Sequence, residues 1–383
     1  MSERKRIYLC LAHMSEAGLE QKYIKEAFDT NWVVPLGPNV NAFEEDLKNY
    51  VGEGREVVAL SAGTAAVHLA LLACGVGYGD EVIVQSFTFC ASSHPITYLG
   101  ATPVFVDSEK ESWNMDPDLL EEAIKDRIAK TGKKPKAIIP VYLYGMPGKI
   151  DEIMEIANRY EIPVIEDSAE AFGSRYRGQL CGTFGDYGIM SFNGNKMITT
   201  SGGGGLICRD EATKKKIMFY ATQSREPMPY YLHKEIGYNY RMSNICAGIG
   251  RGQMTVLDEH LAHHRHLCDR YVQLFADVDG ITVHLNPDER YDSNYWLNTI
   301  LIDPVKTGTN YESIRQHLES CNIESRPLWK PMHTQPVFAD APAYVNGVSE
   351  ELFTMGLCLP SGPWVSDSDV ERVAREIISC CKR

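Results

Sequence analysis

The sequence predicts an α/β fold with a mostly parallel sheet, followed by a smaller α+β domain. From Val57 to Phe192, short apolar runs the length of one buried strand alternate with amphipathic helical segments. After Met242 this alternation gives way to a long helical pattern and then to further strands. Because parallel strands need crossover helices, such alternation is typical of a sheet covered by helices on both faces.

The expected elements follow one another in the order that this fold requires. Two helices, at 17–28 and 40–50, flank an extended stretch that contains Pro35 and Pro38. One of the crossover helices opens at Asp116-Pro117, an N-cap followed by a proline suited to the first helical position. Another crossover helix is expected at 149–160. The expected strands are 57–60, 81–87, 103–107, 137–142, 163–166 and 187–192.

The C-terminal part has a different pattern. One long helix is expected from Met242 to about Phe275, and the elements after it are strands at 281–284 and 295–302 and a helix at 311–321. We therefore predict a large α/β domain over residues 1–250 and a small α+β domain over residues 251–383.

Composition excludes several classes of function. A net charge of −13 disfavours binding to nucleic acid or to an anionic membrane, and no apolar stretch is long enough to span a bilayer. The eleven cysteines are odd in number and irregularly spaced, and Cys90, Cys181, Cys208 and Cys246 stand among apolar or small residues. Buried, reduced thiols in a cytoplasmic protein are the expected explanation.

No metal site is expected from the sequence. There is no Cys-x-x-Cys pair, and the adjacent Cys380 and Cys381 do not have a metal-binding spacing. Four histidines fall on the long C-terminal helix, but no cysteine or His-Glu-x-x-His pattern accompanies them. We expect them on a solvated helix face. They are His260, His263, His264 and His266.

One lysine stands in an unusual frame. Lys196 follows the apolar run 187–192 and precedes two threonines and the four glycines 202–205. A lysine between a buried strand and a glycine-rich turn can lose solvation, which favours the neutral, nucleophilic amine. A flexible, solvated loop explains the same pattern, so this stretch alone leaves both interpretations open.

Two earlier turns follow expected strands, where α/β sheets bind ligands. In Ser61-Ala-Gly-Thr64 a helix begins, and Gly63 and Thr64 would offer N–H groups and a hydroxyl to a phosphate. An ordinary serine N-cap is the alternative. In the second turn, Phe89 could stack on a planar ligand or simply close the core.

A third turn carries three carboxylates within five residues, Glu166, Asp167 and Glu170. An unpaired buried carboxylate is costly, so Asp167 needs a positively charged partner. A protonated heterocyclic nitrogen or an arginine elsewhere in the chain would serve equally well. Together with Lys196 and Ser191, these turns describe a pyridoxal 5′-phosphate (PLP) site.

The sequence also resembles the DegT/DnrJ/EryC1/StrS sugar aminotransferases, which have the aspartate-aminotransferase-like fold type I with a mostly parallel, seven-stranded sheet. The resemblance covers nearly the whole chain. Where the family usually has Thr-Thr-Gly-Glu-Gly-Gly after the lysine, Ser201 and Gly202 replace the first glycine and the glutamate. The motifs that carry it are Gly37-Pro-Asn-Val-Asn-Ala-Phe-Glu44, Ser61-Ala-Gly-Thr-Ala-Ala66, Glu166-Asp-Ser-Ala-Glu-Ala-Phe-Gly173, Ser191-Phe-Asn-Gly-Asn-Lys196 and Gly237-Tyr-Asn-Tyr-Arg-Met-Ser-Asn244.

The resemblance implies a role for each site residue. Lys196 would bind PLP covalently, Asp167 would pair with the pyridine nitrogen, and Phe89 would stack on the ring. Glu170 would lie near the phenolic oxygen. The residues implied to hold the phosphate are Gly63, Thr64 and Ser191. In a homodimer with shared active sites, the residues implied to reach the neighbouring subunit's site are Asn239 and Arg241.

The segment from Glu324 to His333 suggests a second contact. Cations beside an indole, ordered by two prolines, suit a diphosphate and a flat base or sugar face, although a stiff, solvated strand is the alternative. The segment resembles that of aminotransferases acting on 4-keto-6-deoxy-N-acetylhexosamine nucleotides and that of perosamine synthases. The expected nucleotide-sugar contacts are Arg326, Trp329, Lys330 and His333.

The sequence therefore predicts a PLP-dependent aminotransferase that moves the amino group of L-glutamate to the C4 keto group of a nucleotide-linked 4-keto-6-deoxy sugar. UDP-4-keto-6-deoxy-N-acetylhexosamine is the expected substrate, and surface polysaccharide or glycan biosynthesis is the expected purpose. A C3 sugar aminotransferase or a perosamine synthase is the alternative within the family. A non-catalytic, regulatory PLP-binding protein is the alternative of another class.

Overall fold

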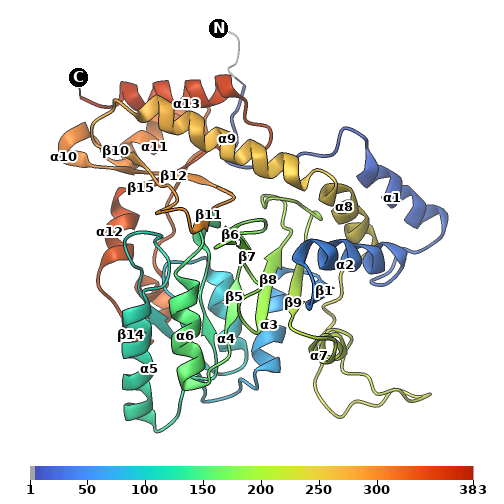
Figure 1. The fold of residues 1–383 in the computed structure, drawn as a ribbon. Coiled ribbons are helices and arrows are strands. Elements are labelled where there is room, and N and C mark those ends of the chain that lie inside the picture. Colours follow the sequence, from blue (N-terminus) through green and yellow to red (C-terminus); the bar gives the residue numbers. More distant parts are fainter. Residues whose placement is uncertain (1–4, 383) are drawn as a thin grey trace.

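A computed structural model describes residues 5–382, so the outermost residues of the two predicted domains, 1–4 and 383, lie outside it. The fold is α/β, as predicted, and is built on one large, mostly parallel sheet (Figure 1). The sheet order is β14-β3-β2-β4, continued through the bridges Ile138–Val164 and Val141–Asp167 into β5-β8-β9-β1. Its strands are β1 Glu56–Leu60, β2 Glu81–Gln85, β3 Thr102–Val106, β4 Ile138–Ile139, β5 Ile165–Asp167, β8 Tyr187–Ser191, β9 Gly204–Cys208 and β14 Ala343–Tyr344.

Helices cover both faces of this sheet. In β2, Val82 and Val84 belong to a core that includes α3 (Gly63–Ala73) and α7 (Glu211–Ala221). Ile83, between them, points to the opposite core. That second core includes α5 (Pro117–Thr131) and α6 (Ile150–Tyr160). The strands are therefore apolar on both sides, which explains why they read as continuous apolar runs in the sequence.

The predicted start of α5 is confirmed. The Asp116 carboxylate accepts hydrogen bonds from the backbone N–H groups of Asp118 and Leu119, at 2.9 and 3.3 Å, and Pro117 is the first helical residue. The N-terminal helices are α1 (Leu19–Asp29) and α2 (Pro38–Val51). Short elements complete this part of the chain: α4 His94–Tyr98, β6 Arg175–Tyr176 and β7 Gln179–Leu180.

The sequence suggested that the glycine run after Lys196 forms a turn. In the structure, the second half of this run belongs to a strand. Gly204 begins β9, which runs antiparallel between β8 and β1 and so forms the centre of that half of the sheet. A Cβ atom on Gly204 would lie 2.4 Å from the backbone of Ala62 and Gly63. Glycine is needed here because the strand passes directly against the turn that opens α3, and the run therefore lacks the usual strand composition.

The long helix predicted from Met242 is two helices, α8 (Asn244–Met254) and α9 (Leu257–Phe275). The hydroxyl of Thr255 donates to the carbonyl of Gly252, at 2.6 Å, and the backbone leaves the helical path at Val256. Within α8, the glycines lie against α1 and α2: a Cβ at Gly250 would approach the Phe43 ring to 2.6 Å. The sequence gives no breaker at this point, which is why the periodicity alone predicted one helix.

Two of the four histidines on α9 are not solvated, which corrects the expectation for that helix. His260 is buried, with its Nδ1 3.1 Å from the carbonyl of Met197, and His264 is fully buried, with its Nδ1 3.1 Å from the carbonyl of Tyr295. Because α9 crosses from the lysine turn to the C-terminal sheet, the face that carries these two side chains is covered by both.

The C-terminal part is an antiparallel sheet of order β10-β12-β15-β13, packed against α9 and two further helices. Ile7 joins this core and pairs with Ile323, so the first described residues lie with the C-terminal part. The domain boundary at residue 250 stays a prediction. The elements are β10 Ile281–Val283, β11 Tyr291–Asp292, β12 Asn298–Ile302, β13 Arg326–Pro327, β15 Gly356–Leu359, α10 Pro304–Thr307, α11 Tyr311–Ser320, α12 Val348–Met355 and α13 Asp367–Ser379.

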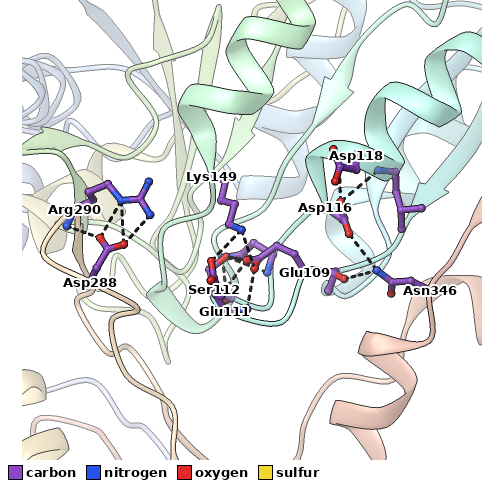
Figure 2. A network of polar contacts seen from close by, with 12 residues as sticks. Glu109, Glu111, Ser112, Asp116, Asp118, Lys149, Asp288, Arg290 and Asn346 are labelled. Atoms are coloured by element: carbon purple, nitrogen blue, oxygen red, sulfur yellow. Dashed lines mark hydrogen bonds and ion pairs between the residues drawn. The ribbon is translucent and has the colours of Figure 1, made fainter.

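A polar network ties the segment around β14 to the large sheet (Figure 2). The side chain of Asn346 donates to the Asp116 carboxylate, at 3.1 Å, and to the carbonyl of Ser108, at 3.0 Å. The Asp107 carboxylate accepts from three backbone N–H groups between Asn346 and Ser349.

None of the helices in residues 5–382 is long and apolar enough to cross a membrane. Cys181 and Cys208 are buried as expected, whereas Cys90 and Cys246 are half-buried.

A buried histidine, His264, and a half-buried one, His284, should make the fold sensitive to acid. Burial lowers the pKa of His264 and that of His284 to about 3. The unfolded chain binds these protons near pH 6.5 and the folded chain does not, so stability falls as pH drops from 6.5 toward 3. At pH 5 each histidine should cost about 2 kcal/mol of unfolding free energy.

Denaturant unfolding at pH 5 and at pH 7.5 measures this loss. His264→Gln should remove part of it, and His266→Gln, on the exposed side of the same helix, should not. An unchanged difference between the two pH values in His264→Gln would contradict the assignment.

Candidate active site

A cavity of about 250 Å³ lies at the carboxyl ends of β1, β5 and β8. Parallel strands that end at one edge bring their following turns together, which is where this fold class binds ligands. Each of the four turns singled out in the sequence contributes to the wall. The side chains and backbone that line it include Ser61, Gly63, Thr64, Thr88, Phe89, Ser92, Asp167, Glu170, Ser191, Asn193, Asn195, Lys196, Trp296 and Trp329.

The lysine turn directs Lys196 into this cavity. Its Nζ lies 3.5 Å from Oε1 of Glu170 and 3.9 Å from the centre of the Trp296 ring. Only 15% of the lysine side chain is exposed. The flexible, solvated loop is therefore not what the structure has, because the amine is held between a carboxylate and an aromatic face.

Asp167 lies at the floor of the same cavity and is buried. Its Oδ2 accepts from the hydroxyl of Ser92 at 2.6 Å, and its Oδ1 accepts from the backbone N–H of Ala169 at 3.1 Å. Burial raises the pKa of Asp167, and the Ser92 and Ala169 bonds and the charge of Lys196 oppose that rise. No arginine or lysine among residues 5–382 forms an ion pair with this carboxylate, so the alternative of an arginine partner is absent there.

Glu170 is the second buried carboxylate of the cavity. Its Oε2 accepts from the backbone N–H of Tyr144 at 2.7 Å, while its Oε1 faces Lys196. Burial raises the pKa of Glu170 above its usual range, and the charge of Lys196 opposes the shift. The two carboxylates thus favour a positively charged ligand between them and the lysine.

The turn at the start of α3 can hold an anion. Ala62 is the N-cap residue of α3 and gives no side-chain cap, so the serine cap suggested as an alternative is not formed. Gly63 and Thr64, the first residues of this eleven-residue helix, line the cavity, and the first N–H groups of a helix have no partner within it. A Cβ at Gly63 would lie 3.3 Å from Cβ of Ser191, so the glycine keeps this corner open.

The aromatic residues form the remaining wall. Phe89 is 54% exposed and its ring centre lies 6.0 Å from that of Trp329. It faces the cavity instead of closing the core. Trp296 and Ser92 were not predicted, although Ser92 stands in the same turn as Phe89. Trp296 comes from the strand region of the C-terminal part, and its Nε1 donates to the carbonyl of Asn195 at 2.6 Å.

Several predicted residues lie outside the cavity lining. Arg241 donates to Oε1 of Glu44, at 2.5 Å, and to the carbonyl of Ala59, at 3.1 Å, both in its own chain. Asn239 is exposed. The remaining three, on the C-terminal segment, are Arg326, Lys330 and His333.

Two of these three have defined partners. Arg326 pairs with Glu324 at 2.8 Å and is mostly exposed. His333 is held by its Nδ1, 2.6 Å from the hydroxyl of Ser86, and by its Nε2, 3.3 Å from the carboxylate of Glu350. Its ring thus joins the end of β2 to α12, which sequence spacing could not show.

The arrangement fits PLP. A buried carboxylate without a cation of its own suits the protonated pyridine nitrogen, the open corner at α3 suits the phosphate, and the lysine lies between them at the wall. An aromatic ring at the cavity face suits a planar ligand. These are the features that the four turns predicted, and they come together in one cavity.

Comparisons with known proteins agree with this site. The sequence model of the DegT/DnrJ/EryC1/StrS aminotransferase family matches residues 15–378. EpsN of Bacillus subtilis (strain 168) is 48% identical over 98% of this chain and 95% of its own. GDP-perosamine synthase of Escherichia coli O157:H7 is 37% identical over 97% of this chain and 98% of its own.

A solved structure gives the same result for the fold. Spr1654 from Streptococcus pneumoniae, in its PLP form, superposes with a TM-score of 0.88 at 26% identity, covering 98% of both chains. The family model and both relatives span nearly the whole length of the sequence. The chain therefore belongs to the DegT/DnrJ/EryC1/StrS aminotransferase family.

Proposed function

We propose that this chain, a PLP-dependent sugar aminotransferase, transfers the amino group of L-glutamate to the C4 keto carbon of a nucleotide-linked 4-keto-6-deoxy sugar. The observation that carries the proposal is the convergence of Lys196, Asp167 and the open N-terminus of α3 on one cavity. A regulatory PLP-binding protein would keep this cavity but would not need the segment from Arg326 to His333, of which Trp329 lines the cavity.

Lys196 performs the proton transfers in this proposal. PLP, when bound, supplies the electron sink that stabilises negative charge at the reacting carbon. The Nζ of Lys196 would move the proton from the α-carbon of glutamate to the cofactor as 2-oxoglutarate is formed, and in the second half-reaction the same amine would move a proton from the cofactor to the sugar carbon. Glu170 and Trp296 fix the position of this amine and limit its contact with water.

Asp167 keeps a proton on the pyridine nitrogen, which is what the electron sink requires. Ser92 positions the carboxylate, because its hydroxyl holds Oδ2 while the backbone of Ala169 holds Oδ1. The hydroxyl of Thr88, 2.8 Å from that of Ser92, continues the chain of hydrogen bonds. Gly63, Thr64 and Ser191 would hold the phosphate.

The nucleotide sugar is proposed to enter past Trp329. This residue lines the cavity, and the exposed cations Arg326 and Lys330 lie on the same segment of the chain. Cations at the rim suit the diphosphate of the substrate. In this proposal His333 positions the segment, since both of its ring nitrogens face side chains of the protein.

A second candidate follows from one of the relatives. Identity of 37% to a GDP-perosamine synthase over nearly the whole chain supports a GDP-linked sugar in place of the UDP-linked N-acetylhexosamine. A role in surface polysaccharide biosynthesis and a cytoplasmic location belong to the same proposal. The location is supported by the eleven cysteines, which are free in the described chain.

The activity is tested with L-glutamate and a panel of keto sugars. The panel holds UDP-, GDP- and dTDP-linked 4-keto-6-deoxy sugars and one 3-keto sugar, and mass spectrometry detects the amino sugar while an enzymatic assay detects 2-oxoglutarate. Amination of a 4-keto sugar is expected, and its carrier identifies the substrate. PLP binding without 2-oxoglutarate formation from any member of the panel would support the regulatory alternative and refute the proposal.

We predict that borohydride reduction of the PLP-loaded protein attaches the cofactor to Lys196. Lys196→Ala should still bind PLP through Gly63, Thr64 and Ser191 but lose turnover, because both proton transfers need the amine. Peptide mapping locates the label. Lys215→Ala, which removes an exposed lysine, is the control and should keep both the label and the turnover. A label on any other lysine overturns the assignment.

Ser92→Ala should move the acidic limb of the activity profile to higher pH. The Ser92 bond favours the charged form of Asp167, so its removal raises the pKa of Asp167 and the carboxylate protonates at higher pH. A hydrogen bond to a charged group contributes about 1.5–3 kcal/mol, which corresponds to roughly one to two pH units.

The pH profiles of kcat and of the cofactor's absorbance measure this shift. Ser93→Ala is the matched control, because the Ser93 hydroxyl bonds only weakly to the carbonyl of Cys90, at 3.3 Å. An unshifted profile in Ser92→Ala would show that Ser92 has no influence on the carboxylate.

Asp167→Asn should lower activity by orders of magnitude at every pH while the fold is kept.

We propose that the functional unit is a homodimer whose sites are completed by the partner. The segment after α7 extends away from the body of the chain (Figure 1) and carries the exposed apolar residues Tyr230, Tyr231 and Ile236. Tyr238 and Tyr240 stack on each other, with ring centres 5.1 Å apart. Large exposed apolar side chains of this kind support a protein interface.

Within this segment, Asn239 is the better probe of a contact in trans. Asn239 is exposed, whereas only 9% of the Arg241 side chain is exposed, and removing it would leave the Glu44 carboxylate without its ion-pair partner. Breaking a nearly buried ion pair by removing one partner costs about 3–5 kcal/mol, so loss of activity in Arg241→Ala would have two explanations.

Mixing two inactive variants should restore activity. When Lys196→Ala and Asn239→Ala chains exchange subunits, half of the dimers are hybrids and each hybrid holds one site with both residues intact. Recovery of about a quarter of the wild-type activity is expected for a two-fold dimer. Native mass spectrometry verifies exchange. Exchange without recovery would place Asn239 in its own subunit's site, and full activity of Asn239→Ala alone would place it outside both sites.

A further inference from the structure

The helices α11 and α13 face each other with metal-binding side chains one turn apart on each. His317 and Cys321 are four residues apart at the end of α11, and Glu376 and Cys380 are four residues apart at the end of α13. Residues at this spacing project from the same side of a helix. The two ends lie together in the C-terminal part of the fold, and none of these residues lines the active-site cavity.

Three of these side chains already have the separations of ligands around one ion. Nε2 of His317 lies 3.1 Å from Oε2 of Glu376, and Sγ of Cys321 lies 3.7 Å from the first and 3.5 Å from the second. Tetrahedral zinc, with bonds of about 2.0–2.1 Å to nitrogen, 2.0–2.2 Å to oxygen and 2.3 Å to sulfur, requires separations of about 3.4 Å between N and O and about 3.6 Å between S and either. Each observed separation agrees to within a few tenths of an ångström.

We propose that His317, Cys321 and Glu376 bind one Zn²⁺ ion, with water as the fourth ligand. The Cys321 thiol releases its proton to solvent on binding, the neutral imidazole gives a lone pair from Nε2, and the Glu376 carboxylate gives an oxygen. All three residues are half-buried, which leaves room for the water. The ion would link the ends of α11 and α13.

Hydrogen bonding alone would also hold these groups together. An imidazole beside a carboxylate and a thiol beside both form acceptable hydrogen bonds at the same distances. The two explanations differ in the thiol: as a hydrogen-bonding group Cys321 is a minor contributor, whereas a thiolate is a principal zinc ligand. Replacement of the sulfur therefore separates them.

The test uses the full-length, PLP-loaded protein with any affinity tag removed, kept reduced and stripped of metal by a chelator. Zn²⁺ is titrated in competition with a chromophoric chelator, and Co²⁺ is used as the spectroscopic probe of thiolate ligation. We expect one Zn²⁺ per chain, a tetrahedral Co²⁺ spectrum, and at least a hundredfold weaker Zn²⁺ binding in Cys321→Ser and in His317→Gln.

Cys381→Ser is the matched control, because this cysteine lies at the same helix end but outside the group of three. It should bind Zn²⁺ as the wild type does, and all three variants should retain the wild-type transamination rate. Zn²⁺ should raise the melting temperature of the wild type and of Cys381→Ser only. Equal Zn²⁺ affinity in Cys321→Ser, or no binding by the reduced wild type, overturns the proposal.

Discussion

The buried carboxylate of Asp167 is the constraint around which this enzyme is arranged. It stands at the end of a central strand, is buried at the cavity wall, and has no ion-pair partner in the described part of the chain. A group in that position is tolerated only because hydrogen bonds hold both oxygens and because a cationic ligand can face it. Ser92, Lys196 and the α3 turn line the cavity around this carboxylate, which is the arrangement that our proposal assigns to PLP.

Much of the fold was predictable because its physical cause is local in the sequence. Strands buried on both faces leave uninterrupted apolar runs in the sequence, as in Val57–Leu60. An N-cap residue followed by a proline, Asp116-Pro117, indicates the start of α5. β9 was not predicted, since Gly204 and its neighbours are there to let the strand pass the α3 turn and carry no strand signature. The break between α8 and α9 was missed for a related reason. At the break the Thr255 hydroxyl bonds to the carbonyl of Gly252, and the helical periodicity of the sequence does not indicate such a local contact.

The same division holds in the active site. Lys196, Asp167, Phe89 and the α3 turn each follow a strand closely, so strand prediction alone places them at one edge of the sheet. Trp296 reaches the cavity from the bend before β12, a hundred residues further along the chain, and no spacing rule connects it to Lys196. The partners of Arg241 and His333 are likewise distant in sequence. The family resemblance implied a contact in the neighbouring subunit for Arg241, and residue type suggested a nucleotide-sugar contact for His333. Both stay predictions, and within its own chain the fold pairs these residues with Glu44 and Ser86.

The return of the chain to the large sheet at β14 has a mechanical consequence. The C-terminal sheet is connected to the rest of the molecule by three stretches of chain: the segment that leads from Ile7 to α1, the junction between α8 and α9, and the segment on either side of β14, which pairs with β3. A body attached at one point can swing in any direction, whereas a body attached at three points that do not lie on one line is held against rotation as a whole. Trp329 lies on the third of these connections, between β13 and β14, so this indole is held at the cavity wall by pairing on both sides of it.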